Sequence, residues 1–244
     1  MRFIPTIVGL CVALGGPLLL FSPLGTLLGE PKALSTLVLG QLFLWFLGFL
    51  LILIIIVWEK LPLSSVGLNI PPLRSNDTSS LSLSLAISLI WGLLTAVLLL
   101  YIITPLGVAF VEYFQLGDFH AGISKLQGLP TWYLIWTGVT AGVIEELLYR
   151  GYLIERLSLL TGKVWVGGIL SVIIFTLVHI PFWGLGLAIF TVFSGVVLTA
   201  LYIYRRDLIA NAIAHGFTGI IQLTAINDMA IHPIEGFKQI QSFF

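Results

Sequence analysis

The sequence contains very little charge. Only 9% of its 244 residues are Asp, Glu, Lys or Arg, against about 25% in soluble domains. Its 11 basic residues equal its 11 acidic residues and form no basic block, so we expect no nucleic-acid partner. The one cysteine, Cys11, has no second cysteine for an intramolecular disulfide. Neither an internal repeat nor a low-complexity tract is visible, so repeat architectures are not indicated.

Long apolar runs are abundant instead. Hydrophobic residues make up 58% of the chain, and the mean hydropathy is +1.09. A membrane-spanning helix needs roughly 20 apolar residues. The first run is longer than the core of an ordinary signal peptide and lacks a small-residue cleavage site, so we expect it to be a span. The sequence therefore predicts an all-α membrane protein, a polytopic helical bundle of about seven transmembrane helices in a lipid bilayer, with apolar runs at about 4–22, 37–58, 81–104, 132–153, 164–180, 184–204 and 208–226.

The basic residues are distributed unevenly between the two ends of such a bundle. With seven spans, eight of the 11 fall on the side of the N-terminus and three, Lys32, Lys125 and Lys238, on the other. Basic residues favour the cytoplasmic side of a membrane. We therefore expect a multi-pass protein with a cytoplasmic N-terminus, whose eight basic residues on that side are Arg2, Lys60, Arg74, Arg150, Arg156, Lys163, Arg205 and Arg206.

Two adjacent glutamates, Glu145 and Glu146, interrupt the run at 132–153. A charged side chain at the centre of a membrane helix costs roughly 2.5–3.5 kcal/mol, so such residues indicate a functional site. Glu146 and Arg150 have the i, i+4 spacing of a favourable helical ion pair. Glu145 points in another direction, because successive helical residues are rotated by about 100°. The pair Glu146 and Arg150 is therefore predicted to be structural, with Glu145 available for chemistry.

Two histidines, His179 and His215, lie in similarly apolar segments. A single histidine in a span is more often a hydrogen-bonding core residue than a ligand. Together with Glu145 they form a Glu/His/His set that suits a metal ion or an activated water. The spacing leaves both possibilities open, with Zn²⁺ as the candidate metal and Glu145, His179 and His215 as its ligands.

The depth of these residues in the membrane tests whether they can meet. Glu145 and His179 each lie 17 residues from Gly162, so an antiparallel pair of helices that turns there places them level. His215 follows the turn at residues 205–207 by only eight residues, which leaves a deficit of roughly 13 Å at the helical rise. The deficit closes if residues 153–160 continue as a helix beyond the membrane face.

The order of these motifs resembles a known family. Glu145-Glu146-x-x-x-Arg150, Phe175-x-x-x-His179 and His215 are similar to the three motifs of the CPBP intramembrane proteases, which include CAAX prenyl endopeptidases and bacterial Abi or bacteriocin-immunity proteins. The resemblance covers about residues 130–225. It implies a catalytic core at 130–226, preceded by N-terminal transmembrane helices and loops at 1–129 and followed by a tail at 227–244.

The resemblance also implies an activity, hydrolysis of a peptide bond within the membrane by a protease or metalloprotease. Glu145 would act as general base on a water held by His179. His215 and Asn211 would bind a metal or stabilise the oxyanion. A prenylated CAAX protein, a signal-like peptide or an immunity-related target would each be a compatible substrate.

One position departs from the family pattern. The third motif has Asn or Asp four residues after the histidine, and here that residue is Gly219. Asn211, four residues before His215, shares its helical face and is the predicted replacement, with Thr218 as a second candidate. Two alternatives remain: a catalytically silent interaction protein of the same fold, which Gly219 favours, and a small-solute transporter. Transporters usually show paired broken helices in repeated halves, and none is visible.

Overall fold

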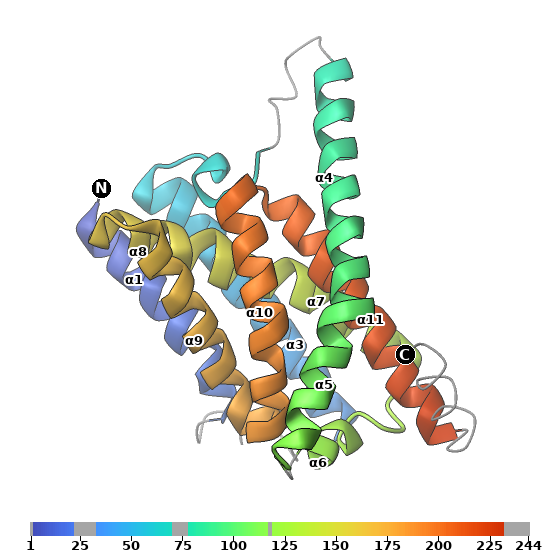
Figure 1. The fold of residues 1–244 in the computed structure, drawn as a ribbon. Coiled ribbons are helices and arrows are strands. Elements are labelled where there is room, and N and C mark those ends of the chain that lie inside the picture. The colour runs from blue at the N-terminus through green and yellow to red at the C-terminus, as the bar shows by residue number, and fades with distance from the viewer. Residues whose placement is uncertain (1, 22–32, 70–77, 117–118, 232–244) are drawn as a thin grey trace.

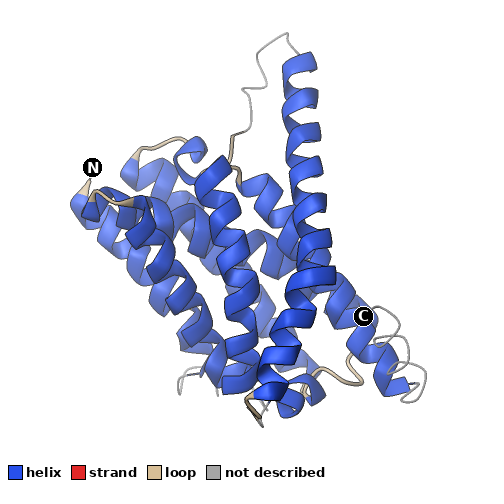
Figure 2. Ribbon diagram, viewed as in Figure 1, coloured by secondary structure: helices blue, strands red, loops and turns tan. Residues whose placement is uncertain are grey.

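A computed structural model describes residues 2–21, 33–69, 78–116 and 119–231, and this part of the chain is helical, without a strand (Figure 2). The predicted all-α membrane fold is confirmed. Figure 1 shows the helices in one bundle. The elements of the first half are α1 (Phe3–Gly15), η1 (Pro17–Phe21), α3 (Leu34–Leu53), η2 (Ile54–Glu59), η3 (Leu63–Val66), α4 (Thr78–Leu98), η4 (Leu99–Ile103), α5 (Thr104–Tyr113) and α6 (Phe119–Ser124).

The second half contains the segments with the candidate site residues. Its first three elements follow one another without a break and form one helical stretch from residue 131 to residue 161. Three long helices then run back and forth across the bundle (Figure 1). The elements are α7 (Thr131–Thr140), η5 (Ala141–Ile154), α8 (Glu155–Thr161), α9 (Val164–Trp183), α10 (Leu185–Arg205) and α11 (Leu208–Ile231).

Within the described residues, six helices are long and apolar enough to span a membrane, one fewer than the seven runs predicted. The run at 132–153 is helical but is not among the six, because Glu145, Glu146 and Arg150 make it too polar. The six are Phe3–Leu20, Leu34–Glu59, Leu81–Tyr113, Val164–Trp183, Leu185–Arg205 and Leu208–Ala225.

The helix that is too polar to span alone lies inside the bundle. η5 contacts α1, α3, α9 and α11, and its nine consecutive residues 146–154 are buried. A helix buried on all sides is shielded from lipid, so its charges can be compensated by neighbouring helices. η5 has π-helical geometry, which is rare and is found mostly at functional sites. The candidate site residues Glu145 and Glu146 therefore lie on a central helix that neighbouring helices enclose.

Two tight turns position the last three helices against η5. Gly162 has a φ of 71°, ends α8, and donates its N–H to the Ser158 carbonyl at 2.8 Å. Only glycine adopts this left-handed conformation without strain. The turn at Gly162 and the helical continuation of residues 153–160 agree with the sequence-based expectation. Arg206, with a φ of 52°, ends α10 in the same way.

A hydrogen bond to the turn between α10 and α11 helps to position the long helix formed by α4, η4 and α5 along the bundle. Ser88 donates its hydroxyl to Asp207 Oδ2 at 2.7 Å, which ties α4 to the turn between α10 and α11. The ten residues 78–87 precede this contact and extend past that turn (Figure 1). The end of the long helix therefore stands clear of the other elements.

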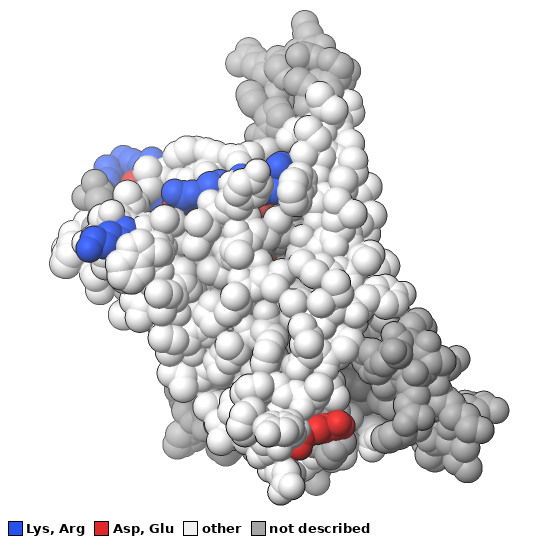
Figure 3. Space-filling model, in the orientation of Figure 1, with Lys and Arg blue, Asp and Glu red and all other residues white. Residues whose placement is uncertain are grey.

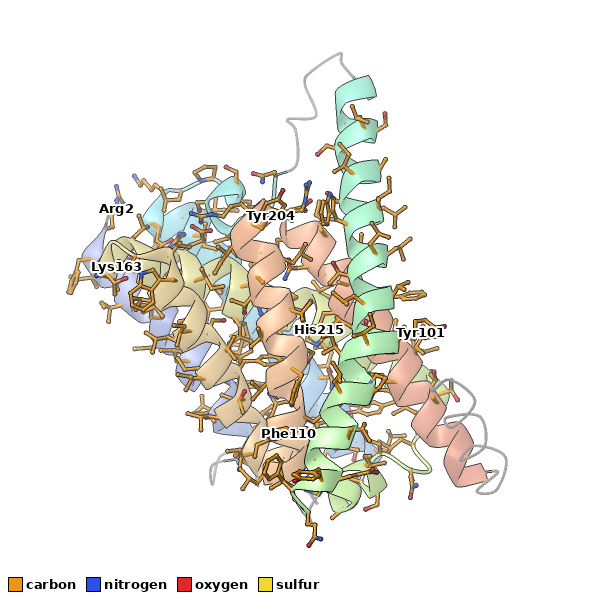
Figure 4. All side chains as sticks on the ribbon, in the orientation of Figure 1. Arg2, Tyr101, Phe110, Lys163, Tyr204 and His215 are labelled. Carbon is orange, nitrogen blue, oxygen red and sulfur yellow. The ribbon has the colours of Figure 1, made fainter. Side chains whose placement is uncertain are left out.

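Basic side chains gather at one end of the bundle. Figure 3 shows the Lys and Arg side chains gathered where the N-terminus and α8 lie. Arg2, Lys163 and Tyr204 all lie at this end in Figure 4. Lys125 follows α6 at the other end and donates to the Phe182 carbonyl at 2.5 Å. The described basic residues are thus asymmetrically distributed.

Candidate active site

Glu146 is the centre of a buried polar network. Its side chain is fully buried, and its Oε1 lies 2.7 Å from both Arg150 Nη1 and His215 Nδ1. Asn211 Nδ2 donates to Oε2 at 3.0 Å. The ion pair expected from the i, i+4 spacing is therefore formed, and two residues of α11 bind the same carboxylate.

Arg150 is compensated on its other side as well. Its Nη2 lies 3.4 Å from the Gly195 carbonyl, and its guanidinium carbon lies 4.3 Å from the centre of the Phe175 ring. A guanidinium over an aromatic ring gains a cation–π attraction, which is strongest where water is excluded. A buried ion pair is tolerated only when further hydrogen bonds satisfy both groups. Contacts with three helices meet that condition in part, because Arg150 Nε has no hydrogen-bond partner among the described residues.

The partners of His215 and Asn211 correct one sequence-based expectation. His215 was expected to converge with Glu145, and Asn211 to share the helical face of His215, whereas the hydrogen bonds of both residues go to Glu146. The two glutamates differ by about 100° in direction, and α11 packs against the face of η5 that carries Glu146. The sequence does not specify this rotation, because η5 is enclosed by neighbouring helices on several sides and has no single face turned to the core.

Glu145 lies on another face of η5 and is partly buried. Within the described part of the chain, it forms no hydrogen bond or ion pair. Its carboxylate interacts electrostatically with His179 and with Tyr149, which lies four residues later on η5. Glu145 is therefore the glutamate that remains available to a water or a substrate.

His179 is oriented by its own helix. Its Nδ1 lies 2.5 Å from the Phe175 carbonyl, and a carbonyl can only accept, so Nδ1 carries the proton. Its ring lies against the Phe175 ring, with 4.5 Å between centroids. The Phe175 ring also lies 6.0 Å from the His215 ring. Phe175 thus holds both imidazoles in place, and the remaining nitrogen of His179, Nε2, is the one available for chemistry.

The same reasoning applies to His215. Its Nδ1 faces a carboxylate, which accepts but does not donate when ionised, so Nδ1–H donates to Glu146. Nε2 is again the available nitrogen. Figure 4 shows His215 about half-way along the bundle, away from the end that carries Arg2 and Lys163. His179 lies near enough to both His215 and Glu145 to interact with them electrostatically.

The site does not fit a metal ion in this arrangement. Among residues 2–21, 33–69, 78–116 and 119–231, no three His, Cys, Asp or Glu side chains form a group that could hold one. Zinc sites require three or four ligands within about 2.0–2.3 Å of the ion. Glu145, His179 and His215 do not form such a group in the described structure.

Both side-chain hydrogens of Asn211 are used in hydrogen bonds within the protein. Its side-chain nitrogen donates to Glu146 and to the Leu198 carbonyl, the latter at 2.8 Å, which uses both of its hydrogens. Gly219 faces α7, since a Cβ added there would lie 3.6 Å from the Gly138 Cα. Thr218 is buried, and its hydroxyl has no partner among the described residues. In this arrangement Asn211 orients Glu146 and has no hydrogen left for an oxyanion.

The sequence analysis missed a second buried ion pair. Arg156 binds both carboxylate oxygens of Glu59, with Nη2 to Oε2 at 2.7 Å and Nε to Oε1 at 3.1 Å. Thr6 and Tyr152 each donate to Oε1 at 2.9 Å, and Ser65 contacts the guanidinium. This Glu59 cluster joins α1, η2 and α8. In the sequence, the one indication of this ion pair is the position of Glu59 at the end of a long apolar run.

Residues 127–221 match the family model described as type II CAAX prenyl endopeptidase Rce1-like. This segment is similar to the CPBP/CAAX proteases. No curated protein and no solved structure matches the chain.

The CAAX-protease segment contains the whole Glu146 network. It begins just before α7 and ends in α11, so it includes Glu145, Glu146, His179, Asn211 and His215. It overlaps the core predicted at 130–226. The elements α1, α3, α4 and α5 lie outside the match and pack around it.

Proposed function

We propose that the protein is a CAAX-type intramembrane endopeptidase that cleaves a prenylated protein by activating a water molecule without a metal. The observation that carries the proposal is the division between the two glutamates. Glu146 is fully occupied by Arg150, His215 and Asn211, whereas Glu145 is unpaired in the described structure and interacts electrostatically with His179. One carboxylate holds the site together and the other can accept a proton.

In this mechanism Glu145 is the general base. Water lies between the Glu145 carboxylate and His179 Nε2, gives a proton to Glu145, and attacks the peptide carbonyl carbon. The proton then moves from Glu145 to the leaving amine nitrogen as the C–N bond breaks. General acid–base catalysis of this kind contributes typically 10²–10⁴-fold.

His215 is the proposed oxyanion donor. In its imidazolium form, Nδ1–H is bound by Glu146 and Nε2–H can donate to the oxygen that becomes negative. The positive charges of His215 and Arg150 then balance the two glutamates, so the site as a whole is neutral. Neutrality is favourable at membrane depth.

A peptide-release assay tests the proposal. The purified protein is reconstituted into vesicles with a farnesylated peptide that ends in a CAAX sequence, and the released tripeptide is measured by mass spectrometry. We expect release by the native protein and a loss of at least about 10²-fold in Glu145→Gln. Glu112→Gln, which changes an exposed carboxylate on α5, is the matched control and should retain full activity. Chelator treatment should leave the rate unchanged.

A catalytically silent interaction protein is the second candidate. Gly219 supplies no polar group where the family has Asn or Asp, and both Asn211 hydrogens are used. Under this alternative the native protein and Glu145→Gln release no peptide but bind the prenylated peptide equally well. Binding without cleavage in the assay above would therefore favour the silent partner.

A further inference from the structure

An apolar groove lies outside the candidate active site, on the surface between α1 and the helix formed by α3 and η2. It is an open surface feature with a volume of about 370 Å³. Leu53, Val57 and Trp58 are exposed along it, so it opens to the surroundings. Its lining consists entirely of apolar side chains, namely Val8, Val12, Leu50, Leu53, Ile54, Val57 and Trp58.

The two walls of the groove are held together by polar contacts at one end. Arg2 Nη1 donates to the Trp58 carbonyl at 3.1 Å. Thr6 on α1 donates to Glu59 at 2.9 Å, behind the groove. These bonds fix α1 against η2, so the groove is built into the fold.

The same end of the groove is positively charged. Arg2 and Lys60 are both exposed there, one on each wall. Glu59, the acidic residue next to Lys60, is 5% exposed and is bound by Arg156, so it does not neutralise this rim. Trp58 is part of the groove lining, and its carbonyl accepts the hydrogen bond from Arg2. Tryptophan prefers the interface between the hydrocarbon and the headgroups of a bilayer.

We propose that this groove is a binding site for an anionic phospholipid. One acyl chain lies along the apolar lining, and the headgroup phosphate binds Arg2 and Lys60. Both walls belong to helices that are long and apolar enough to span the membrane, so the groove opens onto the hydrocarbon from which a lipid can enter. A soluble ligand would find no polar partner along the walls. Binding here holds α1 against η2 and is independent of the proposed hydrolysis.

Native mass spectrometry with defined lipids tests the proposal. The full-length protein in mild detergent is titrated with phosphatidylglycerol or with phosphatidylcholine, and the fraction with one bound lipid is measured. We expect phosphatidylglycerol to bind more tightly. The double variant Arg2→Gln, Lys60→Gln should weaken it by about fivefold for each charge removed, the usual effect of one basic residue at an anionic membrane surface.

Control variants distinguish lipid binding in the groove from non-specific attraction of anionic lipid to the basic residues at this end. Arg205→Gln changes a basic residue that contacts Trp91 and Asp207, and it should leave lipid binding unchanged. Val12→Phe should block the groove and reduce binding of both lipids, with folding checked by thermal unfolding. Inorganic phosphate should not compete, because the acyl chain supplies much of the affinity.

Three results would overturn the proposal. One is equal binding of the two lipids with no effect of the double variant. Another is a loss in Arg205→Gln as large as that in the double variant. The third is a lipid-free dimer that Val12→Phe dissociates, which would mean that a second copy of the chain covers the groove.

Discussion

At the scale of single residues, the two glutamates differ in what their surroundings allow. Glu146 is fully buried and shares its charge with Arg150, so removing that charge leaves a guanidinium without a counter-ion. We expect Glu146→Gln to lower the stability of the protein by about 3–5 kcal/mol, the usual cost of breaking a buried pair. Thermal unfolding in detergent measures the change.

Glu145→Gln is the matched comparison for that variant. Glu145 is partly buried and makes no ion pair within the described residues, so the substitution should leave the unfolding temperature nearly unchanged. If both variants lose stability equally, the assignment of a structural and a chemical glutamate is wrong.

Asn211 tests whether an amide orients the site or acts on the substrate. Because both of its hydrogens are used, Asn211→Ala should destabilise the fold by about 1–3 kcal/mol, the cost of leaving buried acceptors unpaired. Loss of a true oxyanion donor would instead lower turnover by roughly 10²–10³-fold without loss of stability. Unfolding temperature and peptide release, measured on the same sample, distinguish the two roles.

At the scale of elements, glycines set how closely α11 approaches the central helix. A Cβ at Gly142 would lie 2.5 Å from the Ala212 carbonyl oxygen and 2.7 Å from the Gly216 Cα, both backbone atoms that cannot move aside. We expect Gly142→Ala to separate the two helices and to break the bond between His215 and Glu146. The variant should unfold at a markedly lower temperature and show no peptide release.

Gly219→Ala is the control for this contact. Its Cβ would meet the Gly138 Cα at 3.6 Å, an ordinary van der Waals distance, so the change should be tolerated. Gly219→Asn places a longer side chain between α11 and α7 and should be less stable than Gly219→Ala. Equal stability of Gly142→Ala and Gly219→Ala would contradict the packing argument.

The Glu59 cluster joins the N-terminal helix to the CAAX-protease segment. Glu59→Gln leaves Arg156, which is 1% exposed, without its counter-ion, and we expect a loss of about 3–5 kcal/mol. Arg206→Gln breaks the pair with Glu155, but the Arg206 side chain is 47% exposed, so the loss should be below about 1 kcal/mol. Thermal unfolding of the two variants gives the comparison, and similar losses would refute it.

The sequence was informative where the interaction was local. The pair Glu146 and Arg150, the turn at Gly162 and the helical continuation of residues 153–160 depend on spacing within one helix or on one glycine, and all three are found. The partner of His215 and the pairing of Glu59 with Arg156, 97 residues apart, were not predicted correctly. Apolar helices carry no stripe that fixes their rotation, so long-range partners depend on packing that the pattern does not encode.

At the scale of the whole molecule, the charge asymmetry makes a prediction about orientation. We expect the end with Arg2 and Lys163 to be cytoplasmic, because basic residues are retained on that side. Lys163→Cys and Ser124→Cys, each in a Cys11→Ser background, place a thiol at opposite ends. A membrane-impermeant reagent applied to intact cells should label Ser124→Cys and should label Lys163→Cys only after permeabilisation. The reverse pattern would invert the topology.

The long helix of α4, η4 and α5 has a consequence for where the protein can reside. Its residues 78–113 extend for about 50 Å at the helical rise, whereas the hydrocarbon of a bilayer is about 30 Å thick. Tilts up to about 40° only partly reduce the difference between the helix length and the hydrocarbon thickness. The packing of α4 against α11 and the bond from Ser88 to Asp207 oppose sliding of α4 along the bundle. Thin bilayers leave more of its leucines in water than thick ones do. Hydrophobic mismatch would therefore sort this protein toward the thicker membranes of its cell.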